Sequence, residues 1–340
     1  MLNPYDSATT PCGSSSGSAI SAAANFATVT LGSETDGSIL CPSSDNSVVG
    51  IKPTIGLTSR AGVVPITPRQ DTIGPICRTV ADAAYVLDAI VGIDKHDNAT
   101  IEMSKYIPKG GYAQFLRRDG LKGKRIGIVR HPFFEFNISK DVDTFLAKTY
   151  EQHFNTLRQK GAILIDHLKI QNIDEIMNDP SEDVAMRIEI KIALNKYLTE
   201  LVTSPVRSLA DVIDFNNKNS MLEEIKNYGQ ELFLAAETTD GFGKEEKAVL
   251  ANLARQTRDG FKKLMKKYEL DALVAGGYLL PDIPKILAIG GFPGITVPAG
   301  YIKKVPFGIF FGGLRGSEPK LIQIAYGFEQ ATKIRKPPSL

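Results

Sequence analysis

The segments GSSSGSAISAAA, residues 13–24, and SETDGSILCPSS, residues 33–44, decide how the rest of the chain is interpreted. The first is rich enough in glycine and serine to be a flexible linker, yet it continues into alanine-rich sequence with high helix propensity. The second combines glycine with polar residues that favour tight turns. These serines therefore either belong to a flexible linker or take part in catalysis.

The composition favours a packed fold. Of the 340 residues, 43% are hydrophobic and 23% are charged, so the chain can bury a large core and is not disordered by composition. The net charge of +2 gives no reason to expect a nucleic-acid or membrane-surface partner. The basic run between Arg117 and Arg125 contains no aromatic residue, which is typical of a solvated face.

Three cysteines, Cys12, Cys41 and Cys77, are too few and too irregularly spaced to indicate a disulfide framework or a CxxC metal site. Their number favours a reducing compartment. Neither a membrane span nor the charged start and apolar run of a signal peptide is evident. We therefore expect a soluble intracellular protein. The first residues, MLNPYDSATT, begin on turn residues and suggest that an N-terminal part is missing.

Helical and strand periodicities alternate along the chain. Thr79 and Asp82 resemble a capping box at the start of one helix, and Gly161 is typical of the end of another. The expected helices lie at 19–27, 79–91, 140–159 and 319–332, and the expected strands at 28–31, 48–54, 124–130, 162–168, 270–276, 294–300 and 306–313. This alternation predicts an α/β layered fold.

Two stretches interrupt this pattern. Residues 94–123 are polar and broken by Pro108 and glycines, so they predict a surface excursion, whereas residues 181–269 are largely helical and charged. We detect no internal repeat and expect a single domain over residues 1–340.

The four histidines, His96, His131, His153 and His167, neither neighbour a candidate nucleophile nor form an HxxxH pair. We expect surface or structural roles for them. The chain also lacks a phosphate loop of the GxxxxGK type. The sequence therefore predicts no metal and no cofactor.

Two serines are candidate nucleophiles from local sequence alone. Residues 13–17 formally match GxSxG with Ser15 at its centre, but that motif needs a buried strand directly before it, and TTPC is not one. In TDGS, a tight turn through Gly37 could direct backbone N–H groups at a carbonyl attacked by Ser38. TDGS is also an ordinary turn sequence, so both interpretations stay open at this point.

Longer motifs resemble the amidase signature family. TPCGSSSGSA, LGSETDGSI and VVGIKPT match its pattern in order, and the similarity continues through RAGVVPITPRQDTIGPICRTVADAA at 60–84. It returns in GFPGITVPAGY at 291–301 and IAYGFEQAT at 324–332. The part between, roughly 95–265, is where such amidases vary. The resemblance implies an α/β/α sandwich around a mixed twisted sheet, incomplete at the N-terminus of this chain.

The resemblance also assigns roles to residues. Ser38 corresponds to the acyl-forming nucleophile, and Ser14 to the bridging serine that follows a cis peptide bond and relays the proton. Thr35, Asp36 and Gly37 would offer backbone N–H groups to the oxyanion, with Ser15 supporting the loop. The implied substrate is a small-molecule amide, with no nucleic acid and no membrane span.

The chain departs from the family in two notable ways. Leu40 stands where many members carry arginine, which removes a charge near the site. The family's catalytic lysine precedes the bridging serine by several tens of residues, whereas only thirteen residues precede Ser14 here, none of them lysine. Lys52, in GIKPT, is expected to serve structure or the edge of the site. We therefore expect a truncated amidase with impaired activity.

Three hypotheses follow from the sequence. The first is an amide hydrolase acting through Ser38 and Ser14. The second is a catalytically inactive fragment that only binds ligands or partners. The third, an esterase using Ser15, is disfavoured by the absence of a strand before it.

Overall fold

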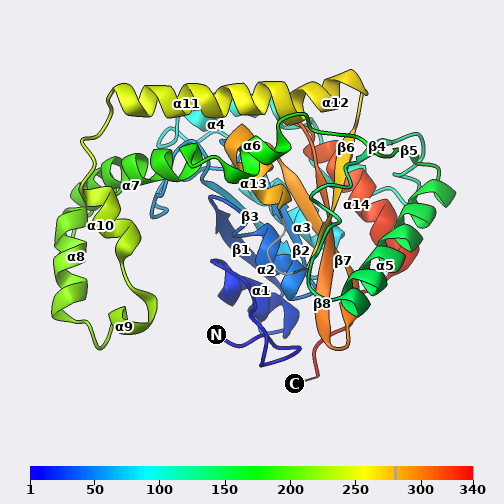
Figure 1. Ribbon diagram of the computed structural model, residues 1–340, viewed down its shortest axis with the longest axis horizontal. Helices are drawn as coiled ribbons and strands as arrows, with labels where there is room; N and C mark the ends of the chain where they lie inside the picture. The colour runs from blue at the N-terminus through cyan, green and yellow to red at the C-terminus, as the bar shows by residue number, and fades with distance from the viewer. Residues whose placement is uncertain (279–281, 340) are drawn as a thin grey trace.

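In the computed structural model, which describes residues 1–278 and 282–339, eight strands form one sheet and helices cover both of its faces (Figure 1). The strands are β1 (Val29–Glu34), β2 (Val49–Lys52), β3 (Thr72–Cys77), β4 (Arg125–Ile128), β5 (Ile163–Ile165), β6 (Ala272–Gly277), β7 (Gly294–Ile302) and β8 (Val305–Gly312). Their order in the sheet is β1-β3-β2-β7-β8-β6-β4-β5.

The sheet is mixed. Neighbouring strands from β1 to β6 in this order are antiparallel, whereas β4 runs parallel to both β6 and β5. Parallel strands need crossover connections, and the helices that supply them cover the sheet faces. The predicted α/β/α architecture around a mixed sheet is thus confirmed.

The helices differ widely in length. They are α1 (Ser16–Ala23), α2 (Leu40–Asp45), α3 (Val80–Ile90), α4 (Ala99–Met103), α5 (Lys140–Gln159), α6 (Ile173–Asn178), α7 (Ser181–Glu200), α8 (Leu209–Lys218), α9 (Ile225–Tyr228), α10 (Glu231–Glu237), α11 (Lys244–Thr257), α12 (Lys263–Lys267), α13 (Ile283–Gly290) and α14 (Glu318–Thr332). Within the described ranges, none is both long and apolar enough to cross a membrane.

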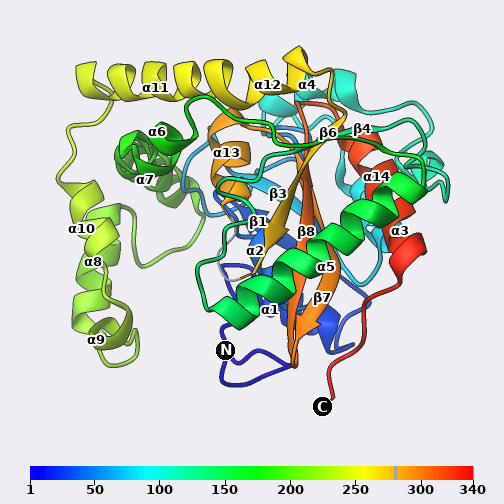
Figure 2. The same ribbon diagram turned by 45° about the vertical axis from the view of Figure 1, so that its right-hand side comes forward.

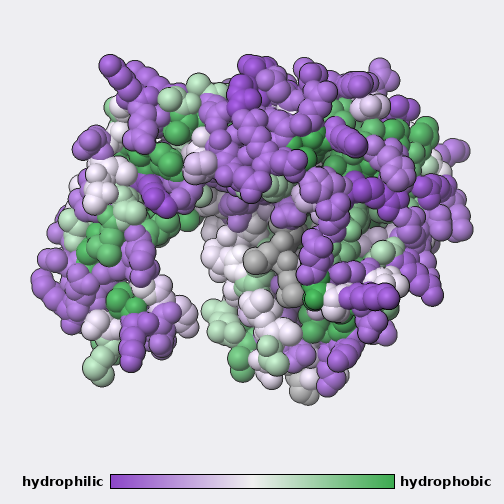
Figure 3. Space-filling view, viewed as in Figure 1, coloured by the Kyte–Doolittle hydropathy of each residue, from purple (hydrophilic) through white to green (hydrophobic). Residues whose placement is uncertain are grey.

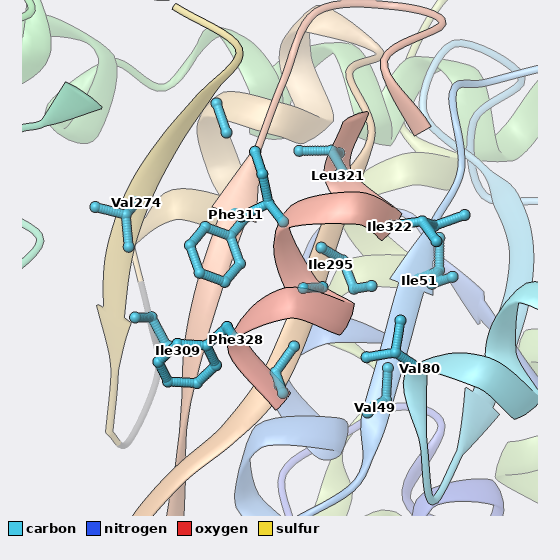
Figure 4. Packing of buried hydrophobic residues seen from close by; sticks show 14 of the residues in the cluster. Val49, Ile51, Val80, Val274, Ile295, Ile309, Phe311, Leu321, Ile322 and Phe328 are labelled. Atoms are coloured by element: carbon cyan, nitrogen blue, oxygen red, sulfur yellow. The ribbon is translucent and has the colours of Figure 1, made fainter. Parts of the chain in front are cut away.

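Alternating residues of the central strands face two separate cores. Ile309 and Phe311 of β8 pack with α14 and α3, as Figure 4 shows for Phe328 and Val80, and α5 closes the same face (Figure 2). Phe310 of β8 belongs to the opposite core, which α2, α6 and α11 to α13 cover. The period of two along a strand explains this division, because successive side chains leave opposite faces of the sheet.

The predicted helix at 140–159 has the bounds of α5, and Gly161 follows it at a φ of 90°. The capping prediction for α3 is also confirmed, since the Thr79 hydroxyl accepts a hydrogen bond from the Asp82 N–H at 3.1 Å. Sequence analysis did not predict β3 or the short helices α2 and α13. Pro42 and two serines give α2 a sequence with low helix propensity.

One edge of the sheet lies beside α1. β1 is the terminal strand there, and the Ser18 hydroxyl of α1 donates to the Leu31 carbonyl of β1 at 2.7 Å. The predicted helix at 19–27 is displaced toward the N-terminus, because α1 begins at Ser16 and ends at Ala23. Its buried residues are small alanines, which allow close packing against the strands.

A helical arm, defined here as residues 190–240, extends away from the sheet. It comprises the second half of α7 and helices α8 to α10 (Figure 1). Figure 3 shows an open gap on this face between the arm and the part of the molecule that contains the sheet. The arm has its own small apolar cluster, which includes Ile190, Leu209 and Ile213.

Candidate active site

The first candidate segment is the loop that leads into α1. Cys12 has a φ of 54°, and the Gly13–Ser14 peptide bond is cis. Ser14 is exposed. The Ser15 hydroxyl donates to the Ser33 carbonyl at 3.0 Å and accepts from the Ser33 N–H at 3.2 Å. Ser15 therefore anchors the loop to β1.

The second candidate segment is the turn at 35–38 between β1 and α2. Gly37 has a φ of 82°, a conformation in which glycine avoids the strain of a side chain. The Glu34 carboxylate accepts hydrogen bonds from the N–H groups of Ile39 at 2.7 Å and Leu40 at 2.8 Å. One buried carboxylate thus fixes the chain on both sides of the turn that holds Ser38.

Further hydrogen bonds fix the start of this turn. Thr35 Oγ1 donates to Asp71 at 2.6 Å, and the Gln70 amide donates to the Thr35 carbonyl at 3.3 Å and to Glu182 at 2.7 Å. Gln70 and Glu182 are both buried. Since Glu182 belongs to α7, a helix of the variable middle region supports the turn. Sequence analysis did not single out these residues, although Gln70 and Asp71 lie within the motif quoted at 60–84.

The loop and the turn lie against each other. The Ser15 N–H donates to the Ser38 carbonyl at 3.2 Å, and a disulfide joins Cys12 to Cys41. A cavity of about 350 Å³ lies at this junction. It is lined by Cys12, Gly13, Asp36, Gly37, Cys41, Met177, Asp282, Pro284 and Lys285. The residues directly before Ser14 and Ser38 in the sequence therefore face one cavity.

The hydroxyl groups of Ser14 and Ser38 form no hydrogen bonds among the described residues. Neither forms a hydrogen bond with the other or with any residue within 1–278 and 282–339. Ser38 is partly exposed and Ser14 is exposed. Their predicted proton relay stays a prediction.

The Cys12–Cys41 disulfide corrects the interpretation of the cysteines. The number and spacing of the cysteines indicated no disulfide framework and favoured a reducing compartment, yet two of the three cysteines are bonded and Cys77 is free and buried. The bonded residues are 29 positions apart, and their Cα atoms lie 6.0 Å from each other because the loop packs against α2. Such a pairing depends on the tertiary fold, which cysteine spacing does not reveal.

Lys52 has the structural position that we expected. It is fully buried, and its Nζ donates to the Phe292 carbonyl at 2.6 Å. Burial lowers the pKa of Lys52 to about 8, although the carboxylates of Glu34 and Glu318 oppose this shift. Burial raises the pKa of Glu34, and Lys52 opposes that shift in turn. Lys52 thus provides the nearby cation for the carboxylate that fixes the turn.

Leu40, which stands where many family members carry arginine, is fully buried. It packs in the core beneath α13 with Ile283 and Leu287. An arginine here would place a charge among apolar side chains, which is costly without a partner. The local surroundings therefore fit leucine.

Two charged residues that line the cavity, Asp282 and Lys285, were missed by sequence analysis. Lys285 of α13 donates to the Met177 carbonyl at 3.1 Å, and Asp36 and Asp282 line the same cavity. Lys285 lies far from Ser38 in the sequence, and no local motif marks it. Both signs of charge face the cavity, so it is suited to a polar ligand.

The alternative sites from the sequence find no matching geometry. Residues 1–12, all described, form no strand, so Ser15 is not placed on a strand-to-helix elbow. No histidine is among the described residues that line the cavity. His153 is instead buried and contacts the Ala299 carbonyl, whereas His131 contacts Glu135 and Asp174 at the surface.

Sequence comparisons with known proteins identify the family of this chain. The family model described as Amidase matches residues 1–281. A probable amidase of Arabidopsis thaliana is 56% identical over 340 residues, which cover 99% of this chain and 63% of that protein. A putative amidase of Schizosaccharomyces pombe is 32% identical, with 98% of this chain and 62% of that protein covered. This chain belongs to the amidase family.

Solved structures of amidases are also similar to this chain. The native peptide amidase from Stenotrophomonas maltophilia superimposes with a TM-score of 0.92 at 39% identity, covering 99% of this chain and 69% of that one. An amidase family protein from Bacillus anthracis superimposes with a TM-score of 0.88 at 34% identity, covering 100% and 64%. The chain spans less than two thirds of the length of the two curated relatives above.

Proposed function

We propose that this chain is an amide hydrolase that acts on a carboxamide through a Ser38 acyl-enzyme, with Ser14 as the proton relay. The observation that carries the proposal is the shared cavity, because Gly13 and Gly37, the direct neighbours of these serines, line it together. Membership of the amidase family and the similarity to a peptide amidase support an amide substrate.

In the proposed reaction, the Ser38 Oγ attacks the carbonyl carbon of the amide while its proton passes to Ser14. Backbone N–H groups of Thr35, Asp36 and Gly37 stabilise the negative charge on the carbonyl oxygen. Ser14 then returns a proton to the leaving amine, and water hydrolyses the ester to release the acid. The hydrogen bonds of Glu34 and Asp71 hold this turn in place before substrate binds.

We further propose that this chain turns over amides slowly. The lysines near the site are committed elsewhere, because Lys52 donates to Phe292 and Lys285 donates to Met177. No lysine hydrogen bonds to Ser14 or Ser38 within the described part of the chain. Without a base that accepts its proton, Ser38 is a weak nucleophile. The extreme form of this idea is a protein that binds amides without hydrolysing them.

The test uses a fluorophosphonate probe that reacts with activated serines, together with hydrolysis of an aryl amide. Ser38→Ala should abolish labelling, and Ser14→Ala should slow it by about a hundredfold or more, as expected for loss of a proton-transfer group. Ser220→Ala, which changes an exposed serine of the arm, is the matched control and should label like the wild type. Labelling of the Ser38→Ala variant at the wild-type rate would exclude the proposal.

The rate itself tests the second proposal. The Stenotrophomonas peptide amidase serves as the reference, and this chain should hydrolyse the amide orders of magnitude more slowly, because losing one member of a catalytic unit removes most of its rate. Equal rates would mean that another residue of this chain is the base. No hydrolysis at all, with measurable amide binding, would support the binding-only form.

A further inference from the structure

Beside the candidate active-site cavity lies a cluster of metal-ligating groups that amide hydrolysis does not use, and two of its three members, Cys12 and Cys41, line the cavity. The sulfurs of Cys12 and Cys41 and a carboxylate oxygen of Asp45 all lie within 4.8 Å of one another. Cys12 comes from the loop before Ser14, whereas Cys41 and Asp45 both belong to α2. The two helix residues are four positions apart, so they share one face of the helix.

Asp45 has surroundings that suit a cation. Its side chain is only 3% exposed, and it takes part in no salt bridge with any residue in the described ranges. A buried carboxylate without a cation is costly, and a bound cation offsets that cost. The carboxylate nevertheless lies beside two sulfur atoms, which are favoured ligands for zinc when they are thiolates.

We propose that Cys12, Cys41 and Asp45 form a zinc site that is closed by the disulfide and opens on reduction. A dithiol reductant supplies two electrons to the sulfur–sulfur bond, which breaks to give two thiols while the reductant becomes a disulfide. Zn²⁺ then displaces both thiol protons to solvent and binds the two thiolates and the carboxylate. Zinc usually takes four ligands, so water completes the site from the cavity side.

Access to the site comes through the cavity. Cys12 and Cys41 both line it, and Cys12 is partly exposed, whereas Cys41 is 4% exposed. A small reductant therefore reaches the disulfide from the Cys12 side. The third cysteine, Cys77, is fully buried in the core beside β1 and offers a matched control.

The first experiment counts thiols in the denatured chain before and after treatment with a phosphine reductant. The proposal predicts one reactive thiol, that of Cys77, in the untreated protein and three after reduction. Three thiols in the protein without reduction would overturn the closed state of the site.

The second experiment measures zinc binding by competition with a chromophoric chelator, using protein reduced and then freed of reductant without oxygen. The reduced wild type should withdraw one Zn²⁺ per chain, and the oxidised wild type should withdraw none. Cys77→Ser should bind like the wild type. The double variant Cys12→Ser/Cys41→Ser should bind none in either state, and Asp45→Asn should bind at least about tenfold more weakly.

Retention of all the zinc by the chelator would overturn the proposal, as would equal binding by the oxidised and reduced wild type. Loss of binding in Cys77→Ser with retention in the double variant would have the same effect. Circular dichroism melting establishes that each variant folds. If a variant does not fold, Co²⁺ added to the reduced wild type decides the matter, since thiolate ligation gives an intense charge-transfer absorption that unligated Co²⁺ lacks. These readouts do not involve amide turnover, so they stand apart from the proposed hydrolase activity.

Discussion

The sheet and the helical arm bury their apolar residues to very different extents. Every residue of β8 is buried, and both faces of this strand meet a core. In the arm, the apolar cluster is small, while Val202, Met221 and Leu222 are 98%, 92% and 83% exposed. Regions with few buried contacts open at low free-energy cost. The contrast teaches that the candidate catalytic segments lie on the rigid part of the molecule.

Charge is also distributed differently between the two regions. Beside the sheet, Lys52, Glu34 and Glu318 form a fully buried group. In the arm, pairs such as Lys218–Asp214 are exposed and 3.8 Å apart. Exposed pairs contribute little to stability, whereas breaking a buried group leaves a charge without a partner. The comparison can therefore be tested with matched substitutions in both regions.

The largest effect is expected for Lys52→Met. Removing the buried cation leaves the Glu34 and Glu318 carboxylates with their backbone hydrogen bonds but without the positive charge of Lys52, and it should lower the free energy of unfolding by about 3–5 kcal/mol. Lys218→Met, at the exposed pair, should change it by less than about 1 kcal/mol. Urea denaturation measures both values. Similar losses of unfolding free energy in the two variants would show that the buried charged group contributes no more to stability than the exposed pair.

Two isoleucine substitutions provide a closer match. Ile309→Ala in β8 and Ile190→Ala in the arm delete the same atoms from buried positions, and such changes cost about 2–5 kcal/mol. Ile309→Ala should lower global stability and speed hydrogen exchange across the sheet. Ile190→Ala should speed exchange mainly at 190–240. Equal acceleration in the sheet by both variants would mean that the arm and the sheet unfold as one unit.

The smallest effect concerns pH and the helix that covers the sheet. Burial lowers the pKa of His153, so the folded protein holds this ring neutral against the Ala299 carbonyl. The unfolded chain binds a proton there below about pH 6.5, so stability should fall as the pH drops through that value. His153→Gln should weaken this dependence between pH 7 and 5, because glutamine cannot bind the proton. Urea unfolding at each pH measures it.

A suitable control for this pH series is Gln152→Ala, because Gln152 is an exposed residue of the same helix and its side chain does not titrate. The difference between wild type and this variant should stay nearly constant with pH. If His153→Gln and the wild type lose the same free energy on acidification, the loss arises elsewhere in the chain.

Local patterns predicted the elements whose residues carry strong periodicity. α5 and the capped start of α3 follow from spacing and capping alone. β3 was missed because its sequence, TIGPIC, contains glycine and proline, and pairing with β1 and β2 is what makes it a strand. Tertiary pairing outweighed propensity there. The single-domain division over 1–340 stays a prediction.

The candidate site was predictable where motifs are contiguous. The segments of Ser14 and Ser38 were identified from contiguous motifs that resemble those of the amidase signature family, and the fold brings both segments to one cavity. The disulfide, Lys285 and the bond from Gln70 to Glu182 join residues far apart in the sequence. Such contacts depend on the assembled layers, so no local pattern contains them.

The bonds from α1 to β1 have a consequence for how molecules meet in solution. A terminal strand with unpaired backbone groups invites a strand from another molecule to add to it. Here the Leu31 carbonyl is occupied by Ser18, and both backbone groups of Ser33 are occupied by Ser15. The serine-rich segment therefore protects the protein against aggregation through this edge of its sheet.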